Sequence, residues 1–466
     1  QLTVDIEDDS NPAENTTGNA TVPSLDQLTQ STWTTFRQNR QHRAFQTATP
    51  SNQRIVEYQT GNYVTSSPAL SANGKILYVG SLDRYLHALD VTTNKLIWKY
   101  KTGSAINSSP CIHPQGHTIY VGSNDHKLHA VHASTGLVKW TYETDNWIWS
   151  SPTITANGEI VYVGSLDGKM HAVNALSGTK NFTYDTGGEV WSSPILSNDE
   201  NTLYWGSLDK VVHATDLWNI HFKQVGVERQ KRFYKWKYKT EGGIYSSPAL
   251  NVAGTVLYVG SWDKNLHAIN TNDGTGIWKF ATKDYIYSSP VVSADGLTVY
   301  ICSTDSSIYA VHAGTGTLKW EHPVGGPIVS SPALSSNGLT LYVGSADSIM
   351  YAINTIDGTR KWIYHTLTGY FVDSSPAVNG NFIYVGSSDS SVYGIEDVGE
   401  KGKGSLDQSF FGNGACEINC VAKVNKTARR NVTLWNLIGH GSRRERSRGV
   451  ELVVGVVIGW CFVMSL

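Results

Sequence analysis

Residues 64–70 read Val-Thr-Ser-Ser-Pro-Ala-Leu, and the tripeptide Ser-Ser-Pro at their centre occurs eight times in the chain. Its proline stands at positions 68, 110, 152, 194, 248, 290, 332 and 376, at intervals of 42, 42, 42, 54, 42, 42 and 44 residues. The one long interval equals 42 plus 12, which a single insertion explains. This spacing indicates eight copies of one structural unit in a single array.

Each copy contains the signals of four short β-strands. Val or Ile stands two places before every Ser-Ser-Pro, a turn such as Asn73-Gly74 follows, and the next strand contains a tyrosine in every copy. The pattern Gly-Ser-x-Asp then leads to a third strand with His or Tyr, and a fourth strand ends on tryptophan, replaced once by Phe182. Four strands in 42 residues match the size of a propeller blade, so we predict an all-β fold, an eight-bladed β-propeller.

The chemistry of strand edges predicts how the blades are oriented and how the ring closes. Proline cannot donate to a strand ladder, so Ser-Ser-Pro should stand at the innermost strand and line the central channel. The tryptophan strand carries alternating lysines, as in Trp98-Lys99-Tyr100-Lys101, which suits an exposed outer edge. Blade eight lacks this strand, whereas residues 55–61 match residues 97–103 with Val56 in the place of Trp98. We therefore predict that the N-terminal strand completes the last blade and closes the ring.

The repeat divides the chain into four parts. Residues 1–52 form a leader that contains Trp33-Thr-Thr-Phe36-Arg37, and its polar composition predicts disorder. Residues 53–397 form the propeller, with the insertion within 217–235; residues 398–451 form an irregular basic tail, and residues 452–466 a hydrophobic C-terminal segment. The insertion is either a functional loop or an unremoved intervening segment, and both interpretations stay open.

Two interpretations of the C-terminal segment also stay open. Its 15 residues without a charge fall short of the roughly 20 that span a bilayer, but they fit the apolar tail of a lipid-anchor signal. The other interpretation is a mistranslated end. We expect a secreted or membrane-surface glycoprotein, and N-glycosylation triplets stand at asparagines 15, 19, 107, 181, 425 and 431.

Composition excludes some classes of partner. The formal net charge of −2 gives no reason to expect binding to nucleic acid. The five cysteines stand at positions 111, 302, 416, 420 and 461, which is neither a disulfide framework nor a zinc motif. We expect a monomer.

Four motifs carry a resemblance to a known family. They are S-S-P-x-L at 66–70, L-Y-V-G-S-x-D at 77–83, L-H-A-x-D at 86–90, and the Thr-Gly pair before tryptophan at 135–140. They resemble the pyrroloquinoline-quinone-like (PQQ-like) repeat family, which includes quinoprotein dehydrogenases and BamB-type outer-membrane assembly scaffolds. The resemblance covers residues 33–397 and implies the propeller fold. It leaves function open, because one fold hosts many activities.

The resemblance offers two functions of different classes. One is a non-catalytic scaffold that binds a protein, a peptide, or a small molecule such as a sugar. The alternative is a quinone-dependent alcohol or sugar dehydrogenase, whose relatives hold pyrroloquinoline quinone with calcium ligands and often an adjacent cysteine pair. The chain has no such pair and no irregular insertion that brings Glu, Asn and Asp together. We therefore expect a scaffold without a cofactor.

Two repeated polar series invite a metal interpretation. Five blades carry a histidine in the third strand, at positions 87, 129, 171, 213 and 267, and the others carry tyrosine at 309, 351 and 393. Tyrosine is not an equivalent zinc ligand, so we expect packing residues with polar tips. The Gly-Ser-x-Asp aspartates stand at 83, 125, 167, 209, 263, 305, 347 and 389. A residue present in every blade more simply accepts backbone N–H groups in a turn than binds calcium.

Positions that vary inside a fixed repeat are free to serve function. The residue just before Ser-Ser-Pro is such a position, and its occupants are Thr65, Asn107, Trp149, Trp191, Tyr245, Tyr287, Val329 and Asp373. Alternation places it opposite the preceding Val or Ile, close to one mouth of the channel. We predict a ligand-binding arc of Trp149, Trp191, Tyr245 and Tyr287, with Asn107 and Asp373 completing the site and Trp147 and Tyr285 nearby. Filling of the space between blades is the competing interpretation.

Overall fold

The computed structural model describes residues 55–93, 95–217, 234–366 and 369–398. All of these belong to a unit of residues 1–404, and a second unit comprises residues 405–466. The leader, most of the insertion and both C-terminal parts lie outside the described residues, as do the glycosylation triplets at 15, 19, 425 and 431. No helix in the described ranges is long and apolar enough to cross a membrane.

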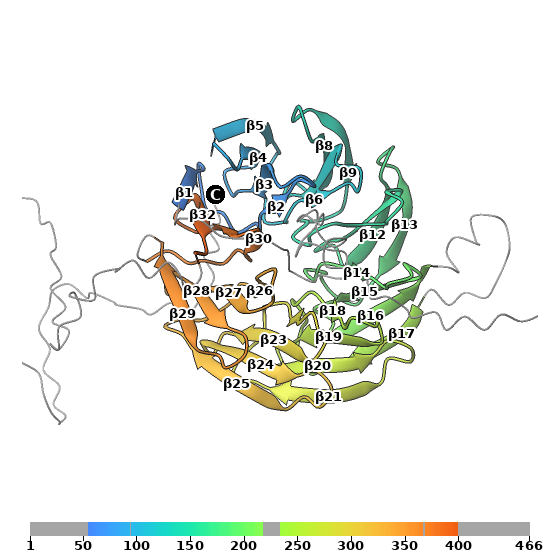
Figure 1. The fold of residues 1–466 in the computed structure, drawn as a ribbon. Coiled ribbons are helices and arrows are strands. Elements are labelled where there is room, and N and C mark those ends of the chain that lie inside the picture. Colours follow the sequence, from blue (N-terminus) through green and yellow to red (C-terminus); the bar gives the residue numbers. More distant parts are fainter. Residues whose placement is uncertain (1–54, 94, 218–233, 367–368, 399–466) are drawn as a thin grey trace, which may run out of the picture. The chain divides into compact units, whose positions relative to one another are not determined.

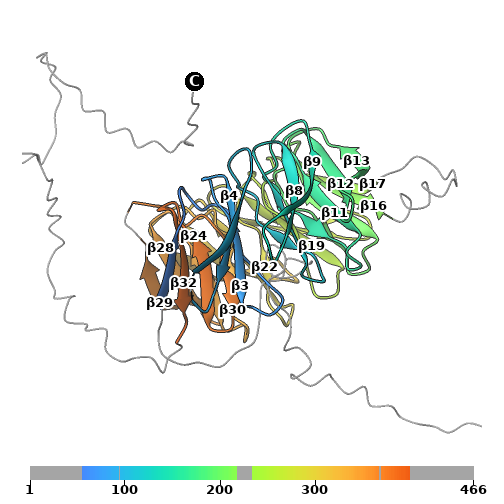
Figure 2. The same cartoon turned by 90° about the horizontal axis from the view of Figure 1, so that it is seen from above.

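Within the described ranges, thirty-two strands form eight antiparallel sheets of four, arranged in a ring (Figures 1 and 2). The innermost strands are β2 (Ala69–Leu70), β6 (Cys111–Ile112), β10 (Thr153–Ile154), β14 (Ile195–Leu196), β18 (Ala249–Leu250), β22 (Val291–Val292), β26 (Ala333–Leu334) and β30 (Ala377–Asn379). The second strands are β3 (Ile76–Gly80), β7 (Thr118–Gly122), β11 (Ile160–Gly164), β15 (Thr202–Gly206), β19 (Val256–Gly260), β23 (Thr298–Ser303), β27 (Thr340–Gly344) and β31 (Phe382–Gly386).

The outer half of each blade follows the same order. The third strands are β4 (Tyr85–Asp90), β8 (Lys127–His132), β12 (Lys169–Asn174), β16 (Val211–Asp216), β20 (Asn265–Asn270), β24 (Ser307–His312), β28 (Ile349–Asn354) and β32 (Ser391–Glu396). The outermost are β5 (Lys95–Lys101), β9 (Val138–Glu143), β13 (Lys180–Asp185), β17 (Tyr234–Lys239), β21 (Gly276–Ala281), β25 (Leu318–Pro323), β29 (Arg360–His365) and β1 (Ile55–Gln59). The predicted eight-bladed propeller is confirmed.

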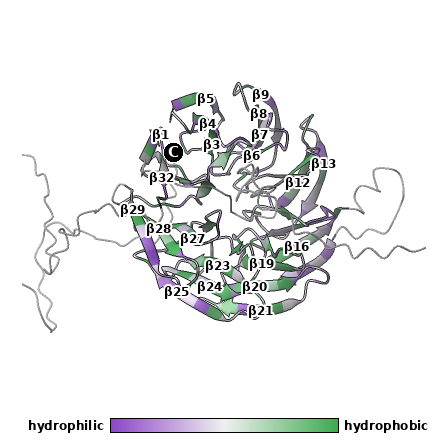
Figure 3. Cartoon of the chain, viewed as in Figure 1, coloured by the Kyte–Doolittle hydropathy of each residue, from purple (hydrophilic) through white to green (hydrophobic). Residues whose placement is uncertain are grey.

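The N-terminal strand closes the ring as the sequence predicts. Strand β1 pairs antiparallel with β32 along its whole length, from Ile55 opposite Ile395 to Gln59 opposite Ser391. Val56 faces Gly394 in the way that Trp98 faces Ala88 in blade one. The lysine-bearing strands form the outer edges, and Figure 3 shows hydrophilic colouring along β25 and β29.

Ser-Ser-Pro does not lie inside a strand, in contrast to the sequence expectation. The innermost strands are only two or three residues long and begin after the proline, as β2 begins at Ala69. The serines hydrogen-bond in place of the missing ladder. The hydroxyl of the first serine accepts the N–H at the end of the second strand, as Ser66 Oγ accepts Gly80 N–H at 3.1 Å. The variable residue therefore precedes the strand.

The second serine of each motif joins neighbouring blades. The backbone N–H of Ser67 donates to Ser109 Oγ at 2.9 Å, and the same bond recurs from blade to blade at 2.8–3.0 Å. The last blade returns to the first, because Ser375 N–H donates to Ser67 Oγ at 2.9 Å. Eight bonds thus form a closed inner ring.

The hydrophobic core lies between the blades. One cluster joins Tyr78 of blade one to Ile106 and Ile112, which lead into and begin blade two. A Cβ atom on Gly80 would lie 2.2 Å from Ile106 Cγ2, so only glycine lets the β-branched residue of the next blade approach this closely. The Val or Ile two places before each Ser-Ser-Pro is therefore a packing residue.

The insertion alters the contact between blades three and four. In four other blades a tyrosine and a tryptophan donate to one carbonyl of the next blade, as Tyr120 Oη and Trp140 Nε1 donate to Ala175 O at 3.2 and 3.1 Å. The corresponding acceptor for Tyr162 would be the carbonyl of Leu217, which is the last described residue before the insertion. Tyr162 Oη is buried without a hydrogen-bond partner among the described residues. Phe182 stands in the place of the tryptophan in this blade. Because its side chain has no N–H group, no second donor needs the Leu217 carbonyl.

Our first prediction concerns ring closure. A chain that begins at residue 62 lacks β1 and exposes the edge of β32, so its melting temperature should fall by several degrees, and it should aggregate more readily. A chain that begins at residue 33 should melt like the parent. Circular dichroism during heating measures both. Equal melting temperatures for the two truncations would contradict closure by β1.

Our second prediction concerns the insertion. Replacing residues 217–235 by the seven residues 271–277 of blade five restores the short turn and returns an acceptor to Tyr162. Adding Phe182→Trp should then increase the free energy of unfolding by about 1 kcal/mol through one further hydrogen bond. Phe182→Trp in the parent chain is the control and should give no gain, because its indole N–H would lack the acceptor. A gain of equal size in both backgrounds would disprove this explanation of Phe182.

Candidate functional site

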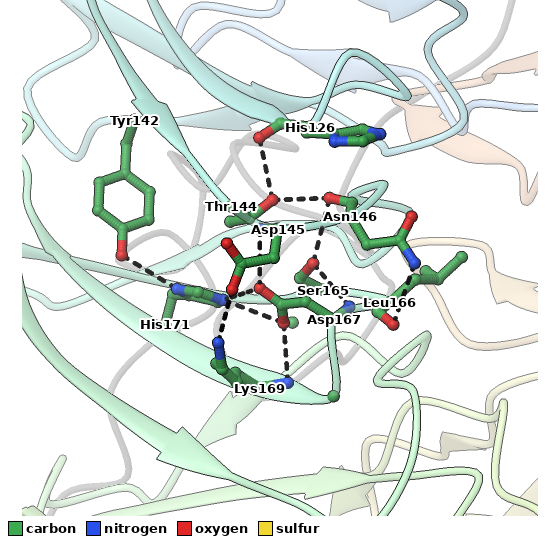
Figure 4. A network of polar contacts seen from close by, with 12 residues as sticks. His126, Tyr142, Thr144, Asp145, Asn146, Ser165, Leu166, Asp167, Lys169 and His171 are labelled. Carbon is green, nitrogen blue, oxygen red and sulfur yellow. Dashed lines mark hydrogen bonds and ion pairs between the residues drawn. The ribbon is translucent and has the colours of Figure 1, made fainter.

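Four of the five histidines of the series form hydrogen-bonded links between blades, and His213 is the exception. In Figure 4, Tyr142 of blade two reaches His171 Nδ1 of blade three at 3.0 Å, and His171 Nε2 contacts Asp167 at 3.0 Å. A neutral imidazole that donates from Nε2 to the carboxylate accepts at Nδ1 from the tyrosine hydroxyl. The histidine is thus engaged at both nitrogens.

The aspartate series has the predicted turn role. Asp167 accepts the backbone N–H group of Lys169 at 2.9 Å and that of Asp145 at 3.2 Å. Asp145 lies in the connection between β9 and β10, which joins blade two to blade three. Burial alone would raise the pKa of Asp167, but the hydrogen bond from His171 and these N–H groups hold it below its usual range. Among the described residues, no three His, Cys, Asp or Glu side chains are grouped to hold a metal ion.

Replacements within the series follow the same hydrogen-bond logic. Where tyrosine replaces histidine, its hydroxyl reaches the aspartate directly, as from Tyr309 Oη to Asp305 at 2.8 Å. In this blade the preceding outer strand carries Phe280, whose ring meets Tyr309 edge-on without a hydroxyl, whereas His322 and Tyr364 meet Tyr351 and Tyr393. The series is therefore explained by contacts between blades.

The variable residues before Ser-Ser-Pro do come together. Trp149 and Trp191 have ring centroids 4.0 Å apart, Trp191 and Tyr245 4.3 Å, and Tyr245 and Tyr287 5.1 Å. The rings are mutually tilted by 56–74°, and all four residues are partly buried. They form one continuous aromatic ladder, which we call the aromatic arc.

The aromatic arc is not part of the hydrophobic core. None of its four members belongs to the six buried clusters that hold the blades together. Trp149 Nε1 donates to Asn124 Oδ1 at 2.8 Å, and Trp191 Nε1 donates to Glu189 Oε2 at 2.7 Å. Both indoles are therefore anchored at the same end of the ring, with their rings against one another.

Sequence reasoning missed a fifth aromatic residue, Trp262. Its ring stacks on Tyr245 at 4.5 Å with an interplanar angle of 24° and lies 5.5 Å from Tyr287. Gly243 leaves room for it, because a Cβ there would lie 3.3 Å from the Trp262 ring. The position after Gly-Ser also varies among blades, and this variation was the signal that could have found Trp262, Asn124 and their counterparts.

The other two predicted residues lie on either side of the arc. Asn107 Oδ1 accepts the Thr65 hydroxyl at 3.0 Å, and Asn107 Nδ2 reaches Asn124 Oδ1 at 3.3 Å. Asn107 is thus linked to Trp149 through Asn124, and both the oxygen and the nitrogen of its side-chain amide are hydrogen-bonded. Asp373 belongs to blade eight, four blades away from Trp191, and no hydrogen bond from another described residue reaches its carboxylate. Burial raises the pKa of Asp373 to about 6.

An open hollow adjoins the arc. It has a volume of about 310 Å³ and is lined by Leu166, Asp167, Gly168 and residues 185–189. Glu189 is common to the hollow and to the Trp191 anchor. Gly168 has a φ of 80°, and the equivalent position in blade one carries the long side chain of Arg84, so the glycine keeps this hollow open.

Comparison with protein families places these observations in context. A family model described as outer membrane protein assembly factor BamB matches residues 18–215 and 262–406, about three-quarters of the chain. The chain belongs to this family. The gap in the match contains the insertion between β16 and β17. The resemblance inferred from the repeat motifs is confirmed.

Solved structures share the fold of this BamB-family chain. The crystal structure of BamB from Moraxella catarrhalis is 20% identical, with a TM-score of 0.60 over 74% of this chain and 100% of that one. The computationally designed Ika8 protein is 14% identical, with a TM-score of 0.61 over 73% and 98%. At such identities the likeness concerns the fold alone. No curated protein sequence matches significantly.

Our third prediction tests the environment of Asp373 in the BamB-family propeller. Its folded-state pKa of about 6 exceeds the value of about 3.9 for an unfolded chain. Between these values the folded state holds a proton that the unfolded state has lost, so this group's stabilising contribution is lost as pH rises. The melting temperature of Asp373→Asn relative to the parent should therefore rise by about 1–2 °C from pH 4 to pH 7. A difference independent of pH would contradict a desolvated carboxyl.

Proposed function

We propose that this protein is a non-catalytic scaffold that binds an extended segment of another protein at the aromatic arc. The observation that carries the proposal is the ladder of four contacting rings at positions that the repeat leaves free. Partly buried aromatic side chains supply a large contact area at low entropic cost, which suits recognition of a peptide. A sugar would also stack on such rings and is the competing ligand.

Family membership supports a protein as the partner. The matching model and the Moraxella catarrhalis structure both carry the name BamB, which the model describes as an outer membrane protein assembly factor. A factor of this kind acts by contact with other proteins. The same name supports an extracytoplasmic location for this chain, and we propose that it is secreted or held at a membrane surface as a monomer.

The donor set does not fit a quinone site with calcium. Among the described residues, Glu189 accepts from Trp191, and no three His, Cys, Asp or Glu side chains are grouped to hold a metal ion. The two described cysteines, Cys111 and Cys302, are buried in different blades and cannot form an adjacent pair. We therefore propose no cofactor and no dehydrogenase activity.

Our fourth prediction separates binding from packing. Trp149→Ala and Trp191→Ala should each cost only about 1 kcal/mol of stability, the worth of an aromatic pair, yet the double variant should lose at least ten-fold in affinity. The measurement is binding of the full chain to an arrayed peptide library and to a sugar array, with unfolding in urea alongside.

The matched control is Trp140→Ala in the outermost strand of blade two, next to the blade of Trp149. Trp140 packs flat on Gly178 and donates to Ala175, so its loss should cost about 3 kcal/mol and leave array binding unchanged. If the double arc variant instead loses several kcal/mol and binding persists, the arc is packing and the proposed site is wrong. Binding to sugars alone would replace the protein partner with a glycan.

A further inference from the structure

The connection into blade eight is longer than the seven others. It comprises residues 366–376, two more than the corresponding residues 324–332 of blade seven, and the shorter length recurs in every other blade. The two extra residues account for the one interval of 44 residues between successive Ser-Ser-Pro motifs. In the described part of the connection, Gly369 N–H donates to Ser348 Oγ at 3.0 Å. Because seven blades form without this extension, it is a place to look for function.

The end of this connection presents apolar side chains to solvent. Phe371 is 50% exposed and stands two places before the variable residue of blade eight, where blade one carries Tyr63 at 42% exposed. The rings of Tyr63 and Tyr370 meet edge-on with centroids 6.5 Å apart. Blades eight and one therefore bring accessible aromatic surface to the same mouth of the channel as the arc, on its opposite side.

Phe371 and the variable residue of its blade, Asp373, stand on the same side of the chain. In blade three these two positions are occupied by Trp147 and Trp149, whose rings stack with centroids 6.0 Å apart. The same backbone bond, donated by the residue after Gly-Ser, holds the first of the two positions in every blade. By this repeated geometry, the exposed ring of Phe371 lies beside the carboxyl group of Asp373.

Among the described residues, no side chain donates a hydrogen bond to Asp373. The bonds of the second serines place it between Val329 of blade seven and Thr65 of blade one. Val329 is apolar, and the Thr65 hydroxyl donates to Asn107 Oδ1 at 3.0 Å. Burial without a partner raises the pKa of Asp373 to about 6. At neutral pH this partly buried carboxylate is therefore ionised and lacks the partner that a desolvated charge requires.

The rest of the mouth does not supply a cation to Asp373. Three positions of each blade border the mouth: the variable residue, the residue two places before it, and the residue after Gly-Ser (Cys-Ser in blade six). At these 24 positions, three in each of eight blades, no Lys, Arg or His occurs, and Glu189 is the only other acid. The charge at the mouth therefore favours a positive ligand and disfavours an anion.

We propose that Asp373 and the exposed rings beside it bind a cationic side chain, lysine or arginine, of the partner segment. The positive group pairs with the Asp373 carboxylate, which gains a charge-assisted hydrogen bond. The apolar stem of the side chain lies on Phe371 and Tyr63, as long basic side chains do on apolar surfaces. This inference rests on the proposed function, since it names the chemistry of a segment that binds at the same mouth.

The test uses the full chain and labelled peptides of Gly, Ser and Thr that carry two central lysines. Matched peptides carry arginine or norleucine instead, and norleucine keeps an apolar stem without the charge. Fluorescence anisotropy at 150 mM salt, where the Debye length is about 8 Å, suppresses long-range attraction. We expect the norleucine peptide to bind at least ten-fold more weakly than the better basic peptide, and that peptide identifies the preferred residue.

The decisive variant is Asp373→Asn, which removes the charge and keeps the shape. It should weaken the better basic peptide at least ten-fold and leave the norleucine peptide unchanged. Its melting temperature, measured alongside, excludes a folding defect. Asp357→Asn is the control for net charge, because Asp357 is an exposed acid in the turn between β28 and β29. This control should change affinity less than two-fold.

Phe371→Ala tests the contribution of the exposed rings. The basic and norleucine peptides share an apolar stem, so both should bind about three-fold more weakly. Ile356→Ala is the matched control, because Ile356 is 76% exposed in the turn between β28 and β29. This control should affect neither peptide.

The dependence on pH gives a second readout of the charge. With a pKa of about 6, Asp373 is ionised at pH 7.5 and mostly protonated at pH 5. Only the ionised form pairs with a cation, so the basic peptide should bind about ten-fold more weakly at pH 5. Asp373→Asn should remove this difference.

The outcomes separate the two proposals. Equal binding of basic and norleucine peptides, equal effects of Asp373→Asn and Asp357→Asn, or no binding of either basic peptide would each overturn the cation site. If peptides from the arrayed library still depend on Trp149 and Trp191 in that case, the protein-binding function of the arc stands. If that dependence fails while basic peptides still require Asp373, the arc is wrong and the cation site stands alone.

Discussion

The hydroxyl group of the second serine in each Ser-Ser-Pro determines how the blades meet. Each hydroxyl accepts the backbone N–H of the preceding blade, and the bond from Ser375 to Ser67 makes the series endless. A net contribution of about 1 kcal/mol for each such bond is modest. Their geometry matters more, because a buried N–H without its acceptor would cost more than the bond contributes. Blade eight must therefore return to blade one, and β1 must supply the strand that blade eight lacks.

The same constraint determines where function can reside. The serines, the Val or Ile before them, the glycine that faces the next blade and the Tyr–His–Asp links all serve contacts between blades. A change at any of these positions acts on two blades at once. The residue just before Ser-Ser-Pro lies at the inner ring but belongs to none of these contacts, so it can vary at little cost. Four successive aromatic residues stand at this position, from Trp149 to Tyr287, and their rings contact one another.

The sequence predicted the features that repeat, and it missed those that depend on a single blade. Equal spacing predicted the propeller, and the match of residues 55–61 to residues 97–103 predicted closure, because both depend on self-similarity. The short innermost strands were not predicted, since hydroxyl groups replace the ladder there, and a strand pattern cannot show this. Trp262 was missed because only the fold brings the loop after Gly-Ser beside the Ser-Ser-Pro of the same blade.

Blade four departs furthest from the repeat, and its departures are connected. Trp205 stands where the other blades have Val or Ile, and its ring stacks on His213 at 5.3 Å with an interplanar angle of 6°. Tyr184 meets Trp205 edge-on at 5.1 Å, and His213 Nδ1 is left without a hydrogen bond among the described residues.

Trp205 Nε1 and Thr215 Oγ1 of this blade are also buried without a partner in the described part of the chain. Unsatisfied groups of this kind cost about 1–3 kcal/mol each. A closed array can tolerate this cost, because the other seven blades hold blade four in place. Blade four also supplies Trp191 and Glu189, at the centre of the arc. The buried polar groups without hydrogen bonds therefore lie in the blade that carries the proposed site. Such groups are common where binding rather than stability selects the residues.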